Sequence, residues 1–222
     1  MRTARFGTPT CLIRDRFILA LGGQTSRYNA TKSCEAYDTV TNHWFPIASL
    51  PVTLVNTTAV VMNERFVYMM PGGNRDCAQG NSLLVMRLDT GSTASYMGDK
   101  ASRTYGGIIA TQKWQSLEFS QADFVRAMPC AGIQLNQTDM LIFGGDSKTY
   151  FTSEMNDKGV AGQPKLNRGT LSTTGKFGMG SDFVARSFGN LVYMIDATNF
   201  NLHVFSSKDG SWNSQPLREL GI

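Results

Sequence analysis

The side chains best suited to acid–base or metal chemistry are few in this sequence. Its two histidines, His43 and His203, each stand without a second histidine nearby. A metal site or a catalytic triad needs several such groups within one small region of a fold. We therefore interpret His43, which precedes Trp44, as a surface turn residue, and His203, in the middle of "NLHVF", as an ordinary strand residue.

Cysteine, serine and phosphate chemistry are no better supported. Four cysteines stand far apart with no Cys-x-x-Cys spacing: Cys11, Cys34, Cys77 and Cys130. The closely spaced ligands of a structural zinc site are therefore missing. The Gly-x-Ser-x-Gly signature of serine hydrolases is absent, and the segments "GIIATQKW" and "FGMGSDF" lack the Lys-Ser/Thr of a phosphate loop. We predict no catalytic residue, no metal, no cofactor and no enzyme activity.

Composition indicates a folded, mildly basic protein. Of its 222 residues, 41% are hydrophobic and 17% are charged, which supports a real core and is unlike a disordered chain. The net charge is +4, but lysines and arginines are scattered singly, whereas a nucleic-acid surface would gather them on one face. No signal-peptide-like segment opens the sequence and no apolar run reaches transmembrane length. We expect a cytoplasmic, reduced, unglycosylated protein that binds neither nucleic acid nor membrane.

A repeated pattern of hydrophobic residues followed by two glycines organises the chain. It occurs as "FILALGGQ" (17–24), "FVYMMPGGN" (66–74) and "MLIFGGDS" (140–147). In a weaker fourth copy, "LVYMIDAT" (191–198), an Asp-Ala pair replaces the glycines. Successive copies are roughly 50 residues apart, with one longer interval, and this spacing is typical of repeat architectures.

Each copy has similar neighbours along the chain. An apolar segment precedes the hydrophobic run, a tight turn such as "RD" or "NE" separates the two, and in most copies another apolar segment follows the glycines. Three of the copies add a last segment that begins near a tryptophan: Trp44, Trp114 and Trp212. Each unit thus predicts strand, turn, strand ending at the diglycine, loop, strand, turn and strand. Four antiparallel strands per roughly 50 residues are one blade of a β-propeller.

The glycines and tryptophans have structural roles in such a blade. Room is scarce where the inner strands of neighbouring blades meet, and glycine permits close approach of the backbone. Tryptophan covers a large apolar area between blades while its ring N–H reaches a backbone carbonyl. We therefore expect both residue types to build the fold and not to bind a ligand.

Taken together, the diglycine, the strand "AYDTVTNHW" and its tryptophan resemble the kelch repeat, and the resemblance covers most of residues 5–220. It implies an all-β fold, a β-propeller built of four-stranded antiparallel kelch-type blades. Such propellers usually close with five to seven blades, most often six, whereas this chain supplies about four. Three explanations stay open: further blades N-terminal to Met1 in a larger six-bladed ring, a compact four-bladed closure, or completion by a second copy or a larger assembly.

The repeat boundaries predict one propeller domain over residues 1–222. Its blades are expected at approximately 1–50, 51–122, 123–178 and 179–222. An insertion at 90–112 should project from the second blade as a loop or irregular hairpin that contacts a partner or a neighbouring blade. Any helix should be confined to a turn within this insertion.

The resemblance also implies where a partner would bind. Kelch modules that bind acidic peptides use residues just after the diglycine and at the start of each innermost strand. The corresponding partner-binding candidates are Gln24, Arg27, Tyr28, Asn56, Asn74, Arg75, Arg126, Asp146, Ser181 and Asp182. Asn56 and Asp182 stand where acidic-peptide binders place arginines, which argues against an acidic peptide as the partner.

The function predicted from these features is a non-enzymatic protein–protein interaction or scaffold module, with cytoskeletal attachment as one form of it. One alternative is the substrate-recognition propeller of a ubiquitin-ligase adaptor, which requires domains outside this chain. A less favoured alternative is a propeller enzyme active on sugars or small molecules, because "SSKDGSW" (206–212) weakly resembles the aspartate box of sialidase propellers. That box is itself structural.

Overall fold

The computed structural model describes residues 1–27, 29–55, 57–72, 78–79, 82–91, 112–119, 131–143, 149–154, 166–170, 183–196 and 200–220. Regular structure within these ranges is β-strand, apart from one short 3-10 helix, Leu217–Leu220. This helical turn follows the last strand, so the expectation that any helix lies in the insertion is wrong for this element. Among the described helices, none has the length and apolar character needed to span a membrane.

The described strands form four antiparallel sheets and one small hairpin. The first sheet contains β1 (Thr10–Ile13), β2 (Phe17–Leu21), β5 (Cys34–Asp38) and β6 (His43–Ile47). The second contains β7 (Ala59–Met62), β8 (Phe66–Met69), β10 (Ser82–Asp89) and β11 (Trp114–Phe119), with β9 (Ala78–Gln79) beside β10. The third contains β12 (Ala131–Gln134), β13 (Asp139–Phe143), β14 (Thr149–Glu154) and β15 (Leu166–Thr170). The fourth contains β16 (Phe183–Phe188), β17 (Leu191–Asp196), β18 (Asn201–Ser206) and β19 (Trp212–Pro216).

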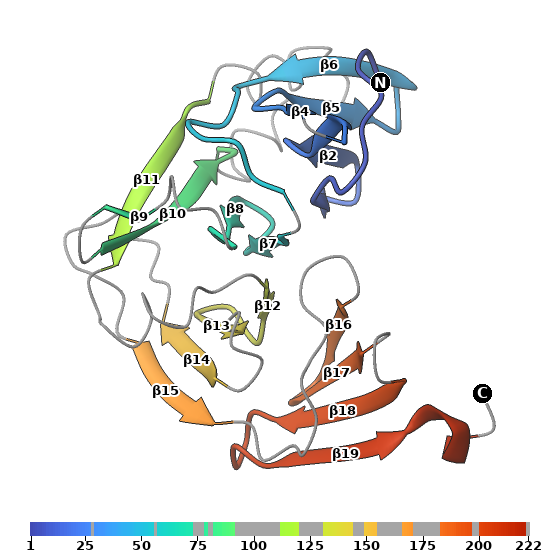
Figure 1. Cartoon of the computed structure of the whole chain (residues 1–222), viewed down its shortest axis with the longest axis vertical. Coiled ribbons are helices and arrows are strands. Elements are labelled where there is room, and N and C mark those ends of the chain that lie inside the picture. Colours follow the sequence, from blue (N-terminus) through green and yellow to red (C-terminus); the bar gives the residue numbers. More distant parts are fainter. Residues whose placement is uncertain are drawn as a thin grey trace.

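The four sheets follow one another around an arc (Figure 1). The first strand of each sheet lies innermost, and these strands are neighbours in the order β1, β7, β12 and β16. No comparable contact joins β16 back to β1 among the described residues. The predicted all-β fold of four-stranded antiparallel blades is confirmed, and the second blade carries β9 as an additional short strand.

Tight turns join the first two strands of the first two sheets, as the sequence predicts. Arg14 and Asp15 have φ of 53° and 49°, and Asn63 and Glu64 have φ of 54° and 53°. Two consecutive residues with positive φ are the mark of a type I′ turn, whose twist matches that of the strands it joins. The two turns also contact each other, because the Arg14 backbone N–H donates to the Glu64 carboxylate.

An arginine–aspartate pair recurs just beyond these turns. Arg16, the turn residue before β2, donates to both carboxylate oxygens of Asp38 on β5, with Nε–Oδ1 at 2.8 Å and Nη2–Oδ2 at 2.7 Å. Arg65, the turn residue before β8, repeats this geometry with Asp89 on β10, with both contacts at 2.7 Å. Each guanidinium lies over the phenylalanine that follows it, 4.8 Å and 4.5 Å from the ring centroids. The bidentate pair links the start of β2 to the end of β5 in the first sheet, and the start of β8 to the end of β10 in the second.

The fourth sheet lacks this ion pair at the matching positions. In the first two sheets the residue after the aspartate donates its N–H to the arginine carbonyl: Thr39 to Arg16 and Thr90 to Arg65. In the fourth sheet Ser207 donates in the same way to Asn190 at 2.8 Å. The backbone hydrogen bond is thus kept, while neutral Asn190 and Ser206 replace the charges.

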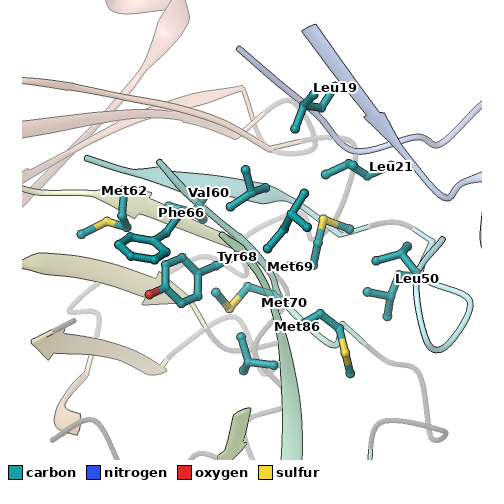
Figure 2. Packing of buried hydrophobic residues seen from close by; sticks show 14 of the residues in the cluster. Leu19, Leu21, Leu50, Val60, Met62, Phe66, Tyr68, Met69, Met70 and Met86 are labelled. Atoms are coloured by element: carbon teal, nitrogen blue, oxygen red, sulfur yellow. The ribbon is translucent and has the colours of Figure 1, made fainter. Parts of the chain in front are cut away.

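The core is built from sheet faces that cover one another. One buried cluster joins the first three sheets, and a second joins Leu141 and Phe143 of β13 to Val192 and Met194 of β17. Figure 2 shows part of the first cluster, where leucines of the first sheet and its following linker face valine and methionine side chains of the second. Methionine suits this position because its unbranched side chain fills irregular gaps.

We expect the Asp38→Asn substitution to destabilise the chain more than Asp89→Asn. The Arg16–Asp38 side chains are 8% and 7% exposed, whereas those of Arg65–Asp89 are 33% and 30% exposed. Loss of one partner of a buried pair leaves the other charge uncompensated, so Asp38→Asn should lower the free energy of unfolding by about 3 kcal/mol. Because the Arg65–Asp89 pair is more exposed, Asp89→Asn should lower the free energy of unfolding by only about 1 kcal/mol. Urea denaturation at neutral pH measures both, and equal losses would contradict the role of burial.

The same pair predicts a pH dependence. Hydrogen bonding from Arg16 lowers the pKa of Asp38 from 3.8 to about 2. Because the folded-state pKa is depressed, the stabilisation is complete above the unfolded-state pKa of about 4 and is lost as the pH falls from there to about 2. Denaturation of the wild type and of Asp38→Asn across this range should show the difference in their stability shrinking as the pH falls. A constant difference would exclude this linkage.

Candidate partner-binding surface

The diglycine after β2 is a point of close backbone approach. Gly22 and Gly23 have φ of 61° and 88°, in the region that favours glycine. A Cβ on Gly23 would lie 2.2 Å from Thr8 Oγ1 and 3.0 Å from the carbonyl oxygen of Phe6. One on Gly22 would lie 3.1 Å from the carbonyl oxygen of Leu54. Room is therefore scarce at this pair, as predicted, but the predicted source of the crowding is wrong: the N-terminal segment, the linker and the loop after the hairpin supply it, and not the inner strands of neighbouring blades.

A small hairpin follows the diglycine where the sequence predicts only a loop. It consists of β3 (Gln24–Ser26) and β4 (Asn29–Ala30). Gln24 exchanges two backbone hydrogen bonds of 2.9 Å with Phe6, and Thr31 donates its N–H to Gly23 at 2.9 Å. The base of the hairpin is thus held by Phe6 of the N-terminal segment and by the Thr31–Gly23 hydrogen bond between the ends of the hairpin itself.

Arg5 fastens the N-terminal segment beneath this hairpin. Its guanidinium donates to the carbonyl oxygens of Gly22 at 3.0 Å and Ser33 at 2.6 Å, to Ser33 Oγ at 2.9 Å and to Glu35 Oε2 at 2.9 Å. Glu35 also accepts the backbone N–H of Arg2 at 2.7 Å. The Arg5 and Glu35 side chains are almost completely buried. A buried charge pair with this many hydrogen bonds fixes the geometry of the segment, since each donor would be costly to leave unpaired.

The linker from the first sheet to the second completes the support. Gly23 donates its N–H to Leu54 at 3.2 Å, and Leu50 donates its N–H to Lys32 at 2.9 Å. The ammonium of Lys32 in turn donates to the Pro51 carbonyl at 2.7 Å. The base of the hairpin is therefore hydrogen-bonded both to the N-terminal segment and to the linker.

The tip of the hairpin presents polar side chains to solvent. Thr25, Ser26, Arg27 and Asn29 are exposed, and Gln24 is half-buried. Gln24 Nε2 donates to the Arg27 carbonyl at 3.4 Å, and Thr25 Oγ1 donates to the Asn29 carbonyl at 3.2 Å. These bonds order the turn, and the exposed surface combines hydroxyls, an amide and one guanidinium. It can donate and accept hydrogen bonds and attract a negative group.

Two of the predicted partner-binding residues, Gln24 and Arg27, lie together on this hairpin. The remaining candidates lie outside the described residues: Tyr28, Asn56, Asn74, Arg75, Arg126, Asp146, Ser181 and Asp182. Residues 92–111, which make up most of the predicted insertion, lie outside them too. Sequence reasoning missed Arg5 and Glu35, which are 30 residues apart and carry no motif that would link them.

The tryptophan prediction is confirmed for Trp114. Its ring N–H donates to the Ala48 carbonyl in the linker after the first sheet at 2.9 Å. Trp212 lies against Phe143 of the third sheet, with ring centroids 6.1 Å apart. Trp114 therefore contacts the linker that follows the preceding sheet, Trp212 contacts the preceding sheet itself, and both serve the fold.

The histidines and described cysteines have the surroundings of structural residues. His43 is exposed at the start of β6, whereas His203 is buried with Nδ1 2.7 Å from Ser214 Oγ. Cys11 and Cys34 are free thiols. Desolvation raises the pKa of Cys11 to about 12 and that of Cys34 to about 11, which keeps both thiols protonated and unreactive. Within the described ranges, no three acidic, histidine or cysteine side chains gather to hold a metal ion.

The chain carries one recognisable family signature. A family model described as the kelch motif matches residues 11–51, which include the first sheet except Thr10, its diglycine and the hairpin. A search of curated proteins gave no match.

Substitution of Gly23 by alanine tests the close approach at the diglycine. Gly210 is the matched control, because it has a positive φ of 70° and nothing within 4 Å of an added Cβ. Gly210→Ala should cost only the backbone strain, about 1 kcal/mol. Gly23→Ala adds a clash with Thr8 and the Phe6 carbonyl and should cost about 3 kcal/mol or more. Thermal denaturation compares the two, and similar losses would mean that crowding at Gly23 is unimportant.

Thiol labelling tests the burial of the two cysteines. At pH 8 an ordinary thiol is partly ionised, so the raised pKa values should slow iodoacetamide alkylation of Cys11 and Cys34 by roughly 100-fold or more in the folded chain. Peptide-level mass spectrometry reads each site separately. The same chain in guanidinium chloride is the control and should be labelled rapidly at both sites. Rapid labelling of the native protein would show that the first sheet opens or packs differently.

Proposed function

Because the chain is a kelch-repeat protein, we propose that it acts as a non-enzymatic scaffold module that binds a protein partner through the loops at the diglycine end of its blades. Kelch repeats are generally protein-interaction modules, and loops on a rigid framework commonly carry recognition. The observation that carries the proposal is the hairpin of β3 and β4, whose tip is exposed and polar while its base is fixed by Arg5, Phe6 and Leu54.

A fixed hairpin favours binding for a physical reason. An ordered loop loses little conformational freedom when a partner docks, so fewer interactions are needed to reach a given affinity. Arg27 adds a planar, permanently charged group that suits carboxylates and backbone carbonyls of a partner. The partner segment should therefore present hydrogen-bond acceptors to the tip. Other loops at the same end of the blades would extend the surface, with Tyr28, Asn56, Asn74, Arg75, Arg126, Asp146, Ser181 and Asp182 as the proposed contributors.

We place this module in the cytoplasm as a single domain. The free thiols of Cys11 and Cys34 support a reducing compartment. Attachment to a cytoskeletal assembly fits a scaffold that needs no further catalytic domain.

The test uses the 222-residue chain as bait for affinity capture, followed by reconstitution with the purified partner. Arg27→Glu should weaken binding by at least roughly tenfold, because it replaces an attractive charge at the tip with a repulsive one. Arg218→Glu is the matched control, since Arg218 is exposed on the 3-10 helix after β19, far along the chain from the hairpin. Equal binding by the wild type and Arg27→Glu would remove the hairpin from the interface. Turnover of glycosides or primary alcohols by the purified chain would contradict the non-enzymatic assignment.

A further inference from the structure

The fourth sheet has an apolar face that no other described part of the chain covers. The register of β16 with β17 and of β17 with β18 places exposed Arg186, the partner of Tyr193, on this face together with six hydrophobic positions: Phe188, Leu191, Tyr193, Ile195, Leu202 and Val204. Phe188 is 81% exposed, Ile195 42% and Tyr193 38%. We call these six residues the fourth-sheet face. Large side chains clustered in this way on a sheet usually mark an interaction surface.

The same positions in the first sheet are buried. Phe188 pairs with Leu191 at the start of the hairpin just as Ile13 pairs with Phe17. Tyr193 and Ile195 then correspond to Leu19 and Leu21, which follow Phe17 at the same intervals. These four first-sheet residues, Ile13, Phe17, Leu19 and Leu21, are completely buried in the cluster shared with the second sheet. The fourth-sheet face is therefore the face that, in the first sheet, the next sheet covers.

The first sheet exposes the opposite kind of face. Leu12 and Ile18 are register partners and are 48% and 37% exposed. On the same side of the sheet, Tyr37 and Trp44 pack on each other with ring centroids 5.2 Å apart. We call these four residues the first-sheet face.

The counterparts of the first-sheet face are covered in the second and fourth sheets. Val67 and Leu88, which correspond to Ile18 and Tyr37, are completely buried. Trp114 and Trp212 correspond to Trp44; Trp114 contacts Ala48 in the linker that leaves the preceding sheet, and Trp212 contacts Phe143 of the preceding sheet. The tryptophan side of a sheet is thus the side that packs on the sheet before it.

Within the chain, one sheet packs its tryptophan side against the opposite face of the sheet before it. The first-sheet face and the fourth-sheet face are the two surfaces of such a contact, and both are exposed. We propose that the chain self-associates head to tail, with the fourth-sheet face of one copy packed against the first-sheet face of a second copy. The occupant follows from the repeat. The fourth-sheet face matches the surface that receives a tryptophan side within the arc, and the first-sheet face is a tryptophan side on which no described sheet packs. Two different surfaces meet in such a contact, so it is heterologous and can continue from copy to copy or close into a ring.

The experiment combines two variants that each block one face. Ile195→Glu places a charge on the fourth-sheet face at a position whose register partners, Val184 and Leu202, are uncharged, and Leu12→Glu places one on the first-sheet face. Both residues are partly exposed in the single chain, so the variants should fold, which circular dichroism melts would check. Val40→Glu is the control, because Val40 is 72% exposed in the β5–β6 turn and belongs to neither face.

Size-exclusion chromatography with light scattering gives the readout. The wild type and Val40→Glu should show a concentration-dependent mass above the 24.4 kDa of one chain. Each blocked variant alone should weaken association by roughly 100-fold or more, because a buried unpaired charge is strongly unfavourable. An equimolar mixture of the two should regain a species of two chains, since each variant retains the face that the other lacks.

Three results would overturn the proposal. The first is a monodisperse wild-type monomer at all concentrations, which would show that the exposed faces do not bring copies together. The second is self-association of either variant alone at wild-type strength, which would indicate like-to-like packing or a different surface. The third is failure of the mixture to associate when both variants remain folded.

Discussion

The need of every sheet to have both of its faces covered governs this structure. A four-stranded sheet with apolar side chains on two sides cannot remove them from water by itself, so each sheet depends on its neighbours in the arc. Ile13 and Leu19 are buried because the second sheet lies over them, and Val192 and Met194 because the third sheet does. Trp114, Trp212 and buried methionines fill the space between sheets, and Leu50 and Leu54 of the first linker join the first cluster. The two ends of the arc are where this requirement is left unmet.

The rigid base of the hairpin is a consequence of the same packing. The linker must pass close to Gly22 and Gly23 to bring the second sheet onto the first, and it leaves its carbonyl oxygens and N–H groups beside the hairpin. Arg5 completes this arrangement from the other side, where its five N–H donors can satisfy several carbonyl oxygens at once. The β3–β4 hairpin, which we propose binds the partner, is therefore held in place by buried residues such as Arg5.

Local sequence pattern was enough to predict the strand order and the turn positions. It also predicted the crowding at Gly22 and Gly23 and the hydrogen bond of the Trp114 ring N–H. Alternation, turn dipeptides and a roughly 50-residue spacing are visible in one chain without any knowledge of three-dimensional contacts. The Arg5–Glu35 pair could not be predicted, since its partners are far apart in sequence and belong to no repeated motif. The hairpin after Gly23 was missed because its two strands are only three and two residues long, too short for a periodic signal. The Arg16–Asp38 and Arg65–Asp89 pairs were detectable in principle, because "RF" and a strand-ending aspartate recur in both copies.

The strands within each sheet follow one another along the chain, and the small hairpin between β2 and β5 is the only described element that interrupts this order in the first sheet. Pairing between successive segments closes only short loops, so its entropic cost is low and each sheet can form before the next is available. The first two sheets also have the arginine–aspartate pairs, which the fourth sheet lacks at the matching positions. During synthesis on the ribosome, strand pairing within the first sheet can therefore begin before the second sheet emerges, and its apolar side chains are removed from water when the second sheet packs on it.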